Sequence, residues 1–497
     1  LLLVTGFQVV AQDSTFFKTY NFDPGCGNKT YAIIKTPDGG MILGGGYACE
    51  FFTNDWMYFK TDTYGDVEWF TNYESVNSPD FHDLIITPGD EIFSVGDYWS
   101  FIGNDGGGYY PGIAKVSPDG DSLWWKTNSM EGYDTCSYDE GEYRSISMAS
   151  DGNLLLSGTK DGCMHGNRLL LSKITPDGET LWLTTDTLYN GGFYHGWDVL
   201  QASNSNIYIA GWGHNLDMCY DAHDCPAHAI LSAYNEDGEF EFSKIFYEET
   251  EAHQTQGYSI IELDDKLVLG SLYVNIFDNN YTFHPLFYVL DYQGNINKKV
   301  YLNLNAYANW TGFVLHSIEK TSDGGFVAVG GGGYRPNGTE YGWMARFNAN
   351  ADMLWYKTLG DTTGQEFFGR IYDVVELDGG RLAFAGSKKI YPENAESFLL
   401  VTDSWGNGNY PSFEMQLDTQ TTEYVHNCLI YPNPATEYIW IDPESCLPEN
   451  YTIYDVAGRP VIKGTLSGKT KLDISNFTQG LYIFKSKTCE SQRIIIY

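Results

Sequence analysis

Short apolar runs alternate with tight turns along the first 400 or so residues of the chain. In the first unit, residues 31–36 (YAIIKT) lead into the turn 37–40 (PDGG). A second run at 41–44 ends in glycine, and an alternating run at 56–60 and an aromatic run at 67–70 follow. Runs of about four to eight residues bounded by Gly, Pro and Asp predict β-strands. Long stretches with helical periodicity are absent from the sequence, so we expect an all-β fold.

This unit repeats along the chain. The glycine that closes its second strand recurs at spacings of 52 to 62 residues, at Gly44, Gly96, Gly158, Gly211, Gly270, Gly330 and Gly386. A repeat of this length with about four strands is typical of a β-propeller blade. We therefore predict a seven-bladed β-propeller.

The last unit lacks a fourth strand. Residues 15–22 (TFFKTYNF) are similar to the fourth strands at 124–127 (WWKT) and 355–358 (WYKT). We predict that this N-terminal strand completes the seventh blade, which would remove an open sheet edge. The expected organisation is a signal-peptide remnant at 1–12, the propeller at 13–411, a linker at 412–427 and a small C-terminal β-sandwich at 428–497.

Three motifs stand in the last 70 residues, at 429–436 (LIYPNPAT), 451–460 (YTIYDVAGRP) and 472–484 (LDISNFTQGLYIF). In this order they resemble the type A C-terminal sorting domain of the type IX secretion system. The resemblance implies that the secretion machinery and its sortase are partners of the chain. It also implies a protein that is secreted or anchored at the outer surface of a Gram-negative bacterium.

Composition and charge narrow the range of partners. The formal net charge is −36, so the chain repels phosphate backbones and a nucleic acid partner is not expected. With 42% hydrophobic and 16% aromatic residues, a packed core is expected rather than disorder. No segment has transmembrane length, and residues 1–12 look like the end of a signal peptide. We predict no cofactor, although the acidic surface leaves a divalent cation open.

Nine cysteines fit an exported protein. Three pairs flank equivalent places or share one loop of the predicted blades: Cys26 with Cys49, Cys136 with Cys163, and Cys219 with Cys225. We expect disulfides there, and the alternative is reduced, buried thiols. Because nine is odd, at least one of the remaining cysteines in the sorting domain is expected to be free.

The predicted loops differ between the two faces of the ring. Turns between the first and second strands and between the third and fourth are short Asp-Gly turns. Loops between the second and third strands, and those between blades, are long and aromatic, and we call their side the long-loop face. Function usually resides on long loops held by a rigid scaffold. The candidate ligand-binding residues there are Trp99, Tyr109, Tyr110, Trp212, His214, Tyr334 and Arg335.

Candidate chemistry is sparse. A lyase needs a base and a charge neutraliser, and His82 or His195 with Arg144 or Arg370 would be the first choices. His214, Asp217, His223 and His228 could ligate a metal, but their spacing matches no known signature, so no metal site is predicted. A Gly-x-Ser-x-Gly elbow is absent.

Three functions remain open on these grounds. We favour a non-enzymatic binding module that takes a glycan or protein at the long-loop face. The alternative is an extracellular polysaccharide-degrading enzyme, for example a propeller-fold lyase. A structural surface or matrix component is the third possibility, because fold alone does not define function.

Overall fold

The computed structural model describes most of the chain. The described residues are 15–49, 55–73, 80–101, 107–127, 141–161, 166–186, 193–214, 226–247, 253–277, 280–303, 310–334, 339–360, 369–389, 395–412, 418–423, 428–443, 449–456, 458–466, 469–486 and 492–497. The chain divides into two units, and the second contains residues 420–497 and two short stretches of the fifth blade.

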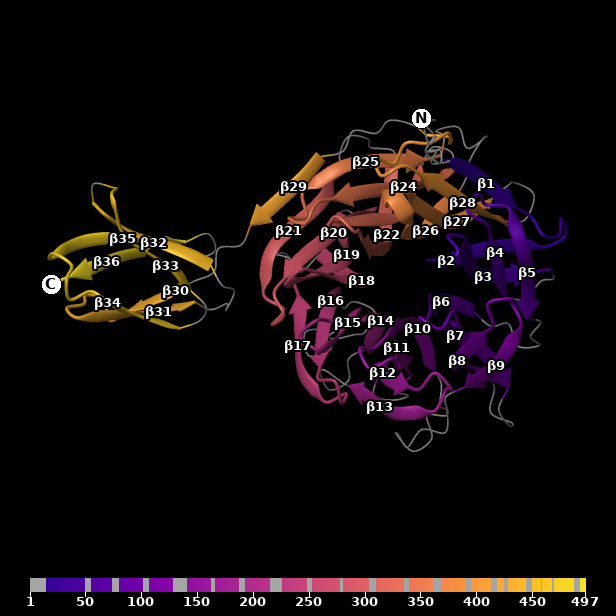
Figure 1. Ribbon diagram of the computed structural model, residues 1–497, viewed down its shortest axis with the longest axis horizontal. Coiled ribbons are helices and arrows are strands. Elements are labelled where there is room, and N and C mark those ends of the chain that lie inside the picture. The colour runs from indigo at the N-terminus through magenta and orange to yellow at the C-terminus, as the bar shows by residue number, and fades with distance from the viewer. Residues whose placement is uncertain are drawn as a thin grey trace, which may run out of the picture. The chain divides into compact units, whose positions relative to one another are not determined.

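The described residues form seven antiparallel sheets of propeller type, as the repeats predict (Figure 1). The first four sheets each hold four strands that are consecutive in the chain. Blade one is β2(Gly27–Lys35), β3(Met41–Ala48), β4(Asp55–Thr61) and β5(Val67–Tyr73). Blade two is β6(Asp80–Ile86), β7(Ile92–Phe101), β8(Gly107–Val116) and β9(Ser122–Thr127). Blade three is β10(Gly141–Met148), β11(Leu154–Lys160), β12(Arg168–Ile174) and β13(Thr180–Asp186). Blade four is β14(Phe193–Gln201), β15(Ile207–His214), β16(Ala227–Tyr234) and β17(Phe240–Phe246).

Blade six has the same four-strand order, whereas blades five and seven each carry a variation. Blade five is β18(His253–Leu263), β19(Lys266–Phe277), β20(Asn280–Leu290) and β21(Ile296–Asn303), with β29(Asp418–Glu423) as a fifth strand. Blade six is β22(Trp310–Lys320), β23(Phe326–Tyr334), β24(Thr339–Phe347) and β25(Met353–Leu359). Blade seven is β26(Gly369–Glu376), the 3-10 turn η3(Asp378–Gly380), β27(Leu382–Lys389) and β28(Ala395–Thr402). Strand β29 lies inside the segment expected to be a linker; the predicted domain boundaries themselves stay predictions.

The N-terminal strand closes the ring as predicted. Strand β1(Phe16–Tyr20) pairs antiparallel with β28 and is the outer strand of blade seven. Its ends are also fixed to blade one, because Tyr20 donates a hydrogen bond to the carbonyl of Gly65 at 2.8 Å and Phe22 stacks on Phe70 at 3.9 Å. The first and last blades are thus joined by a strand from the other end of the chain.

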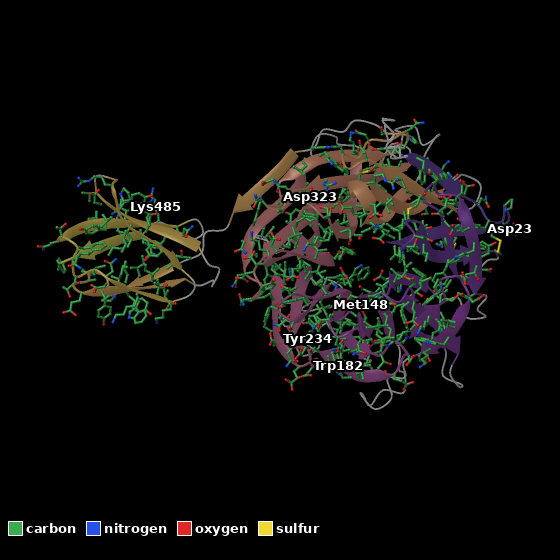
Figure 2. All side chains as sticks on the ribbon, in the orientation of Figure 1. Asp23, Met148, Trp182, Tyr234, Asp323 and Lys485 are labelled. Atoms are coloured by element: carbon green, nitrogen blue, oxygen red, sulfur yellow. A yellow bond between two sulfur atoms is a disulfide. The ribbon has the colours of Figure 1, made fainter. Side chains whose placement is uncertain are left out.

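Apolar side chains pack between successive blades. One cluster joins blades one and two through Trp56, Tyr58 and Phe81, and others join blades two and three, three and four, six and seven, and seven and one. Figure 2 shows side chains filling the space between the sheets, with Trp182 and Tyr234 labelled in the blade three to four cluster. The core is therefore spread around the ring.

The aromatic residues that recur in the outer strands have a defined structural role. Trp69 of blade one lies against the hairpin turn of blade two, where a Cβ on Gly120 would come within 2.9 Å of the indole. Gly120 has φ +88°, which only glycine adopts readily. The Trp69 indole also donates to the carbonyl of Pro118 at 3.1 Å. The same arrangement joins Trp182 to Gly238, so the Asp-Gly turns hold neighbouring blades together.

The C-terminal unit contains two small sheets around one apolar core. One sheet is β30(Cys428–Tyr431), β31(Tyr438–Pro443) and β34(Thr470–Asp473). The other is β32(Glu449–Asp455), β33(Pro460–Leu466), β35(Gly480–Ser486) and β36(Gln492–Ile496). Ile439, Ile453 and Phe484 are fully buried between them. The predicted β-sandwich of about seven short strands is confirmed.

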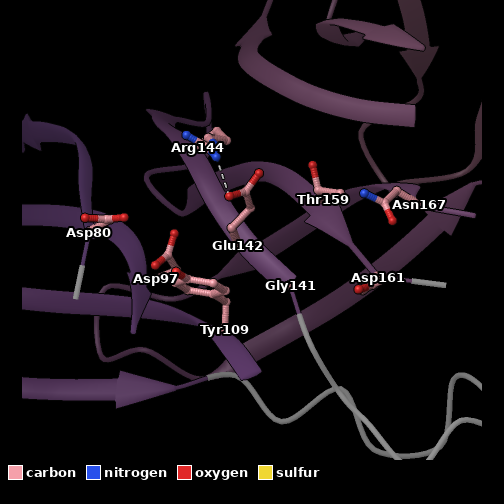
Figure 3. A pocket seen from close by; sticks show the side chains of 9 residues that line it. All are labelled: Asp80, Asp97, Tyr109, Gly141, Glu142, Arg144, Thr159, Asp161 and Asn167. Carbon is pink, nitrogen blue, oxygen red and sulfur yellow. Dashed lines mark hydrogen bonds and ion pairs between the residues drawn. The ribbon is translucent and has the colours of Figure 1, made fainter. Parts of the chain in front are cut away.

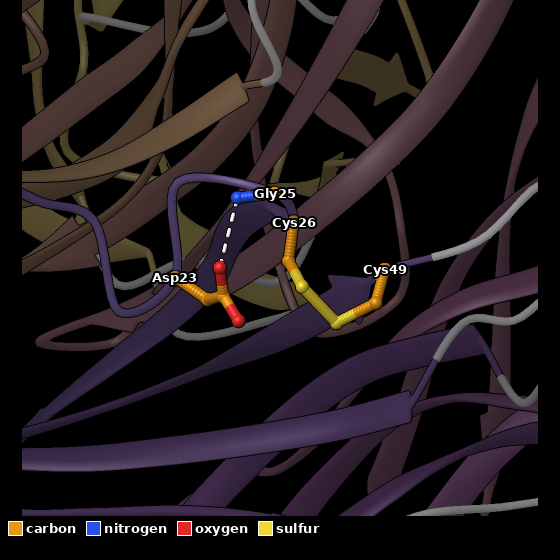
Figure 4. Close-up of a disulfide and its surroundings, with 4 residues drawn as sticks. All are labelled: Asp23, Gly25, Cys26 and Cys49. Atoms are coloured by element: carbon orange, nitrogen blue, oxygen red, sulfur yellow. Dashed lines mark hydrogen bonds between the residues drawn. A yellow bond between two sulfur atoms is a disulfide. The ribbon is translucent and has the colours of Figure 1, made fainter.

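One of the three expected disulfides lies within the described residues. Cys26 and Cys49 are bonded at the ends of β2 and β3, and Asp23 caps the turn before them by accepting a hydrogen bond from the amide of Gly25 at 2.8 Å (Figure 4). This pairing is confirmed. Cys136, Cys163, Cys219 and Cys225 lie outside the described residues, so the other two pairs stay predictions.

Candidate functional site

In the six blades whose inner pairing is described, the first strand has an irregularity that places one side chain on the axis of the ring. In blades two and three the pairing of the first and second strands skips one residue, His82 and Arg144 respectively. The recurring glycine makes this bulge possible, since a Cβ at Gly158 would lie 1.9 Å from the carbonyl oxygen of Glu142. Bulges commonly redirect side chains near functional sites.

Seven side chains, one from each blade, line a cavity of about 140 Å³ at this axis, and we call them the channel ring. They are Tyr31, His82, Arg144, Trp197, Tyr258, His316 and Tyr372. Neighbours in the ring contact one another: the guanidinium of Arg144 lies 4.7 Å from the Trp197 ring centre, and Trp197 meets Tyr258 edge-on at 5.1 Å. The ring is thus aromatic and polar rather than aliphatic.

The residues that directly follow the channel-ring residues in sequence form a second layer of side chains, which links neighbouring blades by hydrogen bonds. Asp198 accepts hydrogen bonds from Ser145 of blade three at 2.8 Å and from the amide of Ile260 of blade five at 2.8 Å. Asp373 likewise accepts from Ser317 at 2.9 Å and from an amide of blade one. Because these carboxylates bind backbone and hydroxyl donors, we assign this layer a structural role.

A larger cavity, of about 360 Å³, opens between blades two and three. We call it the blade 2–3 pocket, and Figure 3 shows its lining residues. They are Asp80, Asp97, Tyr109, Gly141, Glu142, Arg144, Thr159, Asp161 and Asn167. They lie at the start of the first strands, the end of the second and the start of the third, which is the long-loop face. Arg144 lines both this pocket and the axial cavity.

Asp97, His82 and Arg144 form a hydrogen-bonded chain beside the pocket. The Arg144 Nη1 donor lies 3.5 Å from His82 Nδ1, so Nδ1 is an acceptor and the imidazole proton resides on Nε2. Nε2 then donates to Asp97 Oδ2 at 3.0 Å. Burial and the charge of Arg144 lower the pKa of His82 to about 3, which keeps the imidazole neutral.

Asp97 and Glu142, the two carboxyl groups in or beside this hydrogen-bonded chain, have pKa values shifted in opposite directions. Burial, together with the charge of Glu142, raises the pKa of Asp97 to about 7. Burial also acts to raise the pKa of Glu142, but the charge of Arg144 and its hydrogen bond to Glu142 Oε2 outweigh it, so that pKa is lowered. The pocket therefore holds one carboxyl that keeps its proton near neutral pH and one that stays ionised.

His82, Asp97 and Glu142 each offer a ligand atom, and the three atoms lie within 4.8 Å of one another. Metals take such sets of imidazole and carboxylate groups. A ligating histidine needs a free Nε2 lone pair and usually donates its Nδ1 proton to an acceptor. Arg144 presents a donor to Nδ1 instead. We therefore assign these groups no metal.

The structure brings two of the four residues predicted for a lyase, His82 and Arg144, into contact, and neither cavity has His195 among its described lining residues. His82 and Arg144 are in direct contact, and the charges of Glu142 and Arg144 act on His195, whose pKa burial lowers to about 4. His195 accepts or donates a hydrogen bond with Thr159 at 3.2 Å. The fourth, Arg370, is paired with Glu340 at 2.8 Å and is not among the described residues that line either cavity.

The predicted ligand-binding residues fall in different places. Tyr109 lines the blade 2–3 pocket and is 46% exposed, whereas Tyr110 is buried against Tyr98. Trp212 stacks on His195 at 4.3 Å, with His214 edge-on to it at 5.7 Å. For Trp99 and Tyr334 only the backbone strands are described, and Arg335 lies outside the described residues.

Among the four weak metal candidates, His228 is buried and packs against Tyr247 at 4.6 Å. Asp217 and His223 lie outside the described residues, so the structure says nothing of that group. Burial, together with the charge of His214, lowers the pKa of His228 to about 4.

Sequence reasoning missed Glu142 and most of the channel ring. A signal was present: each ring residue lies 12 to 14 positions before the glycine that closes the second strand of its blade. Aligning the repeats on that glycine would have selected Tyr258, His316 and Tyr372. Glu142 stands two positions before Arg144, on the same face of β10, and is found by the same alignment.

Comparison with known proteins identifies the C-terminal part. Residues 429–497 match the secretion system C-terminal sorting domain. No curated protein matches the chain.

Solved structures similar to the chain have low identity and modest overlap. A Dyadobacter fermentans protein of unknown function is 11% identical over 78% of this chain and 97% of its own, with a TM-score of 0.43. The polysaccharide lyase Uly1 is 11% identical over 75% of this chain and 90% of its own, with a TM-score of 0.47. A Penicillium chrysogenum α-L-arabinanase with bound arabinobiose is 14% identical over 65% and 92%, with a TM-score of 0.40. At these values they carry no argument about function.

In the described residues, no helix is long and apolar enough to cross a membrane. The sorting motifs, the seven-stranded sandwich that they build and the family match agree with one another. The chain is a β-propeller that carries the C-terminal sorting domain of the type IX secretion system, and it is secreted or attached at the outer cell surface.

Proposed function

We propose that the propeller binds a neutral glycan in the blade 2–3 pocket. The observation that carries this proposal is the convergence of hydrogen-bonding groups and an exposed aromatic ring around one cavity of about 360 Å³. Ligand sites of roughly 300–1,000 Å³ with a few placed polar groups are typical of small-molecule and sugar-sized ligands. Sugar hydroxyls pair with carboxylates and amides, and an exposed tyrosine offers a stiff apolar surface for a pyranose or furanose ring.

The charge of the pocket favours a neutral ligand. Asp80, Asp97, Glu142 and Asp161 line it, and Arg144 is the one cation among its described lining residues. Arg144 is already paired with Glu142. A uronate or sulfated glycan would therefore meet uncompensated carboxylates in a partly buried site.

The same charges weigh against a lyase. That reaction needs a cation to neutralise the substrate carboxylate. The guanidinium of Arg144 is already neutralised by the carboxylate of Glu142. Arg370, the other candidate, is paired with Glu340. A lyase acting on acidic polysaccharide is thus supported less well than recognition of a neutral one.

A panel of neutral and acidic polysaccharides tests the proposal. We expect the intact protein to bind one or more neutral glycans, and Tyr109→Ala to weaken binding about fivefold, through loss of a stacking surface worth roughly 1 kcal/mol. Asp177→Asn, on an exposed Asp-Gly turn, is the matched control and should bind normally. Binding confined to acidic glycans, or unaffected by Tyr109→Ala, would contradict the proposal. Capture of a protein instead of a glycan would also contradict it.

A further inference from the structure

We propose that the blade 2–3 pocket also cleaves the glycan it holds, as a glycoside hydrolase in which Asp97 is the proton donor and Glu142 the nucleophile. This inference rests on the proposed function, because a glycan must occupy the pocket. Glycoside hydrolysis uses two carboxyl groups on either side of the scissile bond, one protonated and one ionised. The pocket offers such a pair on adjacent blades, on β7 and β10.

The separation of the pair predicts the stereochemical outcome. Carboxyl oxygens of Asp97 and Glu142 lie within 4.8 Å of each other. Inverting enzymes keep their carboxyl groups about 6.5–9.5 Å apart to fit a water molecule, and retaining enzymes about 5–5.5 Å. This upper bound lies closer to the retaining arrangement, in which one carboxylate attacks the sugar directly, than to the inverting one.

The surroundings of Asp97 suit a proton donor. The residue is 3% exposed, and burial acts on its pKa more strongly than the backbone hydrogen bond from Asp80, which acts to lower it. His82 Nε2 holds the carboxyl oxygen Oδ2 at 3.0 Å and so fixes the orientation of the group. Burial raises the pKa of Asp97 to about 7, which leaves a proton available near neutral pH.

The surroundings of Glu142 suit a nucleophile. Arg144 binds Oε2 and keeps the carboxylate ionised, which leaves Oε1 as the attacking oxygen. Arg144 is itself held by its contact with the Trp197 ring at 4.7 Å. Two carboxyl groups with pKa values shifted in opposite directions are a recurring feature of acid and nucleophile pairs.

The reaction follows from these roles in two steps. Glu142 Oε1 attacks the anomeric carbon while the Asp97 proton moves to the glycosidic oxygen, so the C–O bond breaks and the leaving sugar departs as an alcohol. A water molecule then attacks the same carbon, its proton passes to Asp97, and the ester bond to Glu142 breaks. The net reaction consumes one water and releases a sugar with the original anomeric configuration.

The first experiment measures new reducing ends from xylan, mannan, arabinan, galactan and mixed-linkage β-glucan. Asp97→Asn and Glu142→Gln are each expected to lower the rate by at least about a hundredfold, since each removes one half of the mechanism. Asp177→Asn should keep the wild-type rate. Glycan affinity is measured on the same variants, and both substitutions preserve side-chain volume, so binding should persist.

The second experiment separates the two roles with activated dinitrophenyl glycosides of the sugar that is released. Such leaving groups need no protonation in the first step, so Asp97→Asn should keep most of its kcat/KM on them while kcat stays low, because the second step still lacks its base; Glu142→Gln should lose both. In Glu142→Gly, added azide should restore turnover and yield a glycosyl azide of inverted configuration. This rescue also shows that the variant is folded.

The outcomes distinguish the two proposals. If the wild-type protein binds a neutral glycan but releases no reducing ends, hydrolysis is overturned and binding stands. If it neither binds nor cleaves any neutral glycan, both fail. Unsaturated product ends would identify elimination instead and overturn the assigned roles, as would full activity in Glu142→Gln.

Discussion

At the scale of single residues, a bulge in the inner strand decides what reaches the axis in the six blades whose inner pairing is described. In blades two, three, four, six and seven the recurring glycine is required, because a side chain there would collide with the backbone of the inner strand. The residue that protrudes is free to vary, and the protein uses it for tyrosine, histidine, arginine and tryptophan. A fixed glycine thus supports a variable and chemically rich ring.

Asp198 is the residue on which two blade junctions depend. Replacing it with alanine would leave the amide of Ile260 and the hydroxyls of Ser145 and Ser259 without their acceptor. We expect a loss of about 2–4 kcal/mol of folding free energy, since each buried unsatisfied donor costs roughly 1–3 kcal/mol. Thermal or urea unfolding measures it, with the exposed Asp177→Ala as control. A change below about 0.5 kcal/mol would show that water replaces the carboxylate.

His82 is a positioning residue in this account, and its effect should appear in the pH profile. Its Nε2–H bond to Asp97 favours the ionised form of that carboxyl. In His82→Leu we therefore expect the pKa of Asp97 to rise, and the alkaline fall in kcat/KM, near pH 7 in the wild type, to move to higher pH. A merely structural role would lower activity without moving that limb.

At the scale of elements, the strand that closes the ring carries a disproportionate share of stability. Strand β1 supplies the outer edge of blade seven and contacts blade one through Tyr20. Removing residues 1–22 should lower the free energy of unfolding by several kcal/mol, and with it the melting temperature, because ring closure couples the end blades.

The control for ring closure is Tyr20→Phe. It keeps the strand and removes one hydrogen bond, and it should cost only about 1 kcal/mol. Equal melting temperatures for the truncated and full-length proteins would show that β1 does not hold the ring together.

Most strands could be predicted from the sequence because the turns that bound them have short, local sequence signatures. Asp-Gly turns, recurring glycines and outer-strand aromatics predicted seven blades and the closing strand β1. Strand β29 was not predicted, since its sequence DTQTTE has no apolar alternation and its pairing depends on a distant edge. Strand pairing over long sequence separation leaves little local trace.

The candidate site was readable only in part, for a similar reason. His82, Arg144 and Tyr109 were selected by residue type and by position on the long-loop face. Their partners Asp97 and Glu142 matter because two blades bring them together. Burial raises the pKa of Asp97 and Arg144 lowers that of Glu142, and no sequence spacing records either effect. Arg370 has the right residue type and was placed on the same face, yet it lies in another blade and pairs with Glu340.

At the scale of the whole molecule, stability should pass through a maximum in acid solution. Burial raises the pKa of Asp83 to about 7 and that of Glu319 to about 8, so these groups release protons on unfolding and stability falls as pH rises through 7 to 8. Burial lowers the pKa of His82 and His316 to about 3. Unfolding lets them take up protons below about pH 6.5, so stability falls as pH drops further.

The two sets oppose each other between roughly pH 4 and 6.5, which is where we expect the highest unfolding temperature. Thermal melts from pH 3 to 9 measure the curve. Glu319→Gln should reduce the fall in unfolding temperature above pH 7 and leave its fall at acidic pH unchanged. An unfolding temperature that keeps rising from pH 6.5 to 8.5 would contradict this assignment.

The sorting domain and the propeller divide the charge unequally. Residues 428–497 hold seven Lys and Arg against seven Asp and Glu, so the whole net charge of −36 belongs to the rest of the chain. Export should depend on the neutral domain. Deleting residues 428–497 is expected to leave the propeller in the periplasm of a secretion-competent host, which fractionation detects. Normal arrival at the surface would show that the export signal lies elsewhere.

The central claim is that the blade 2–3 pocket is the site where a neutral glycan binds. The most direct measurement is a crystal structure of Glu142→Gln with an oligosaccharide from the glycan that binds best. The account predicts a sugar ring against Tyr109 and a glycosidic oxygen within hydrogen-bonding distance of Asp97. Ordered glycan on the Asp-Gly turn face, with the blade 2–3 pocket filled only by water, would contradict it.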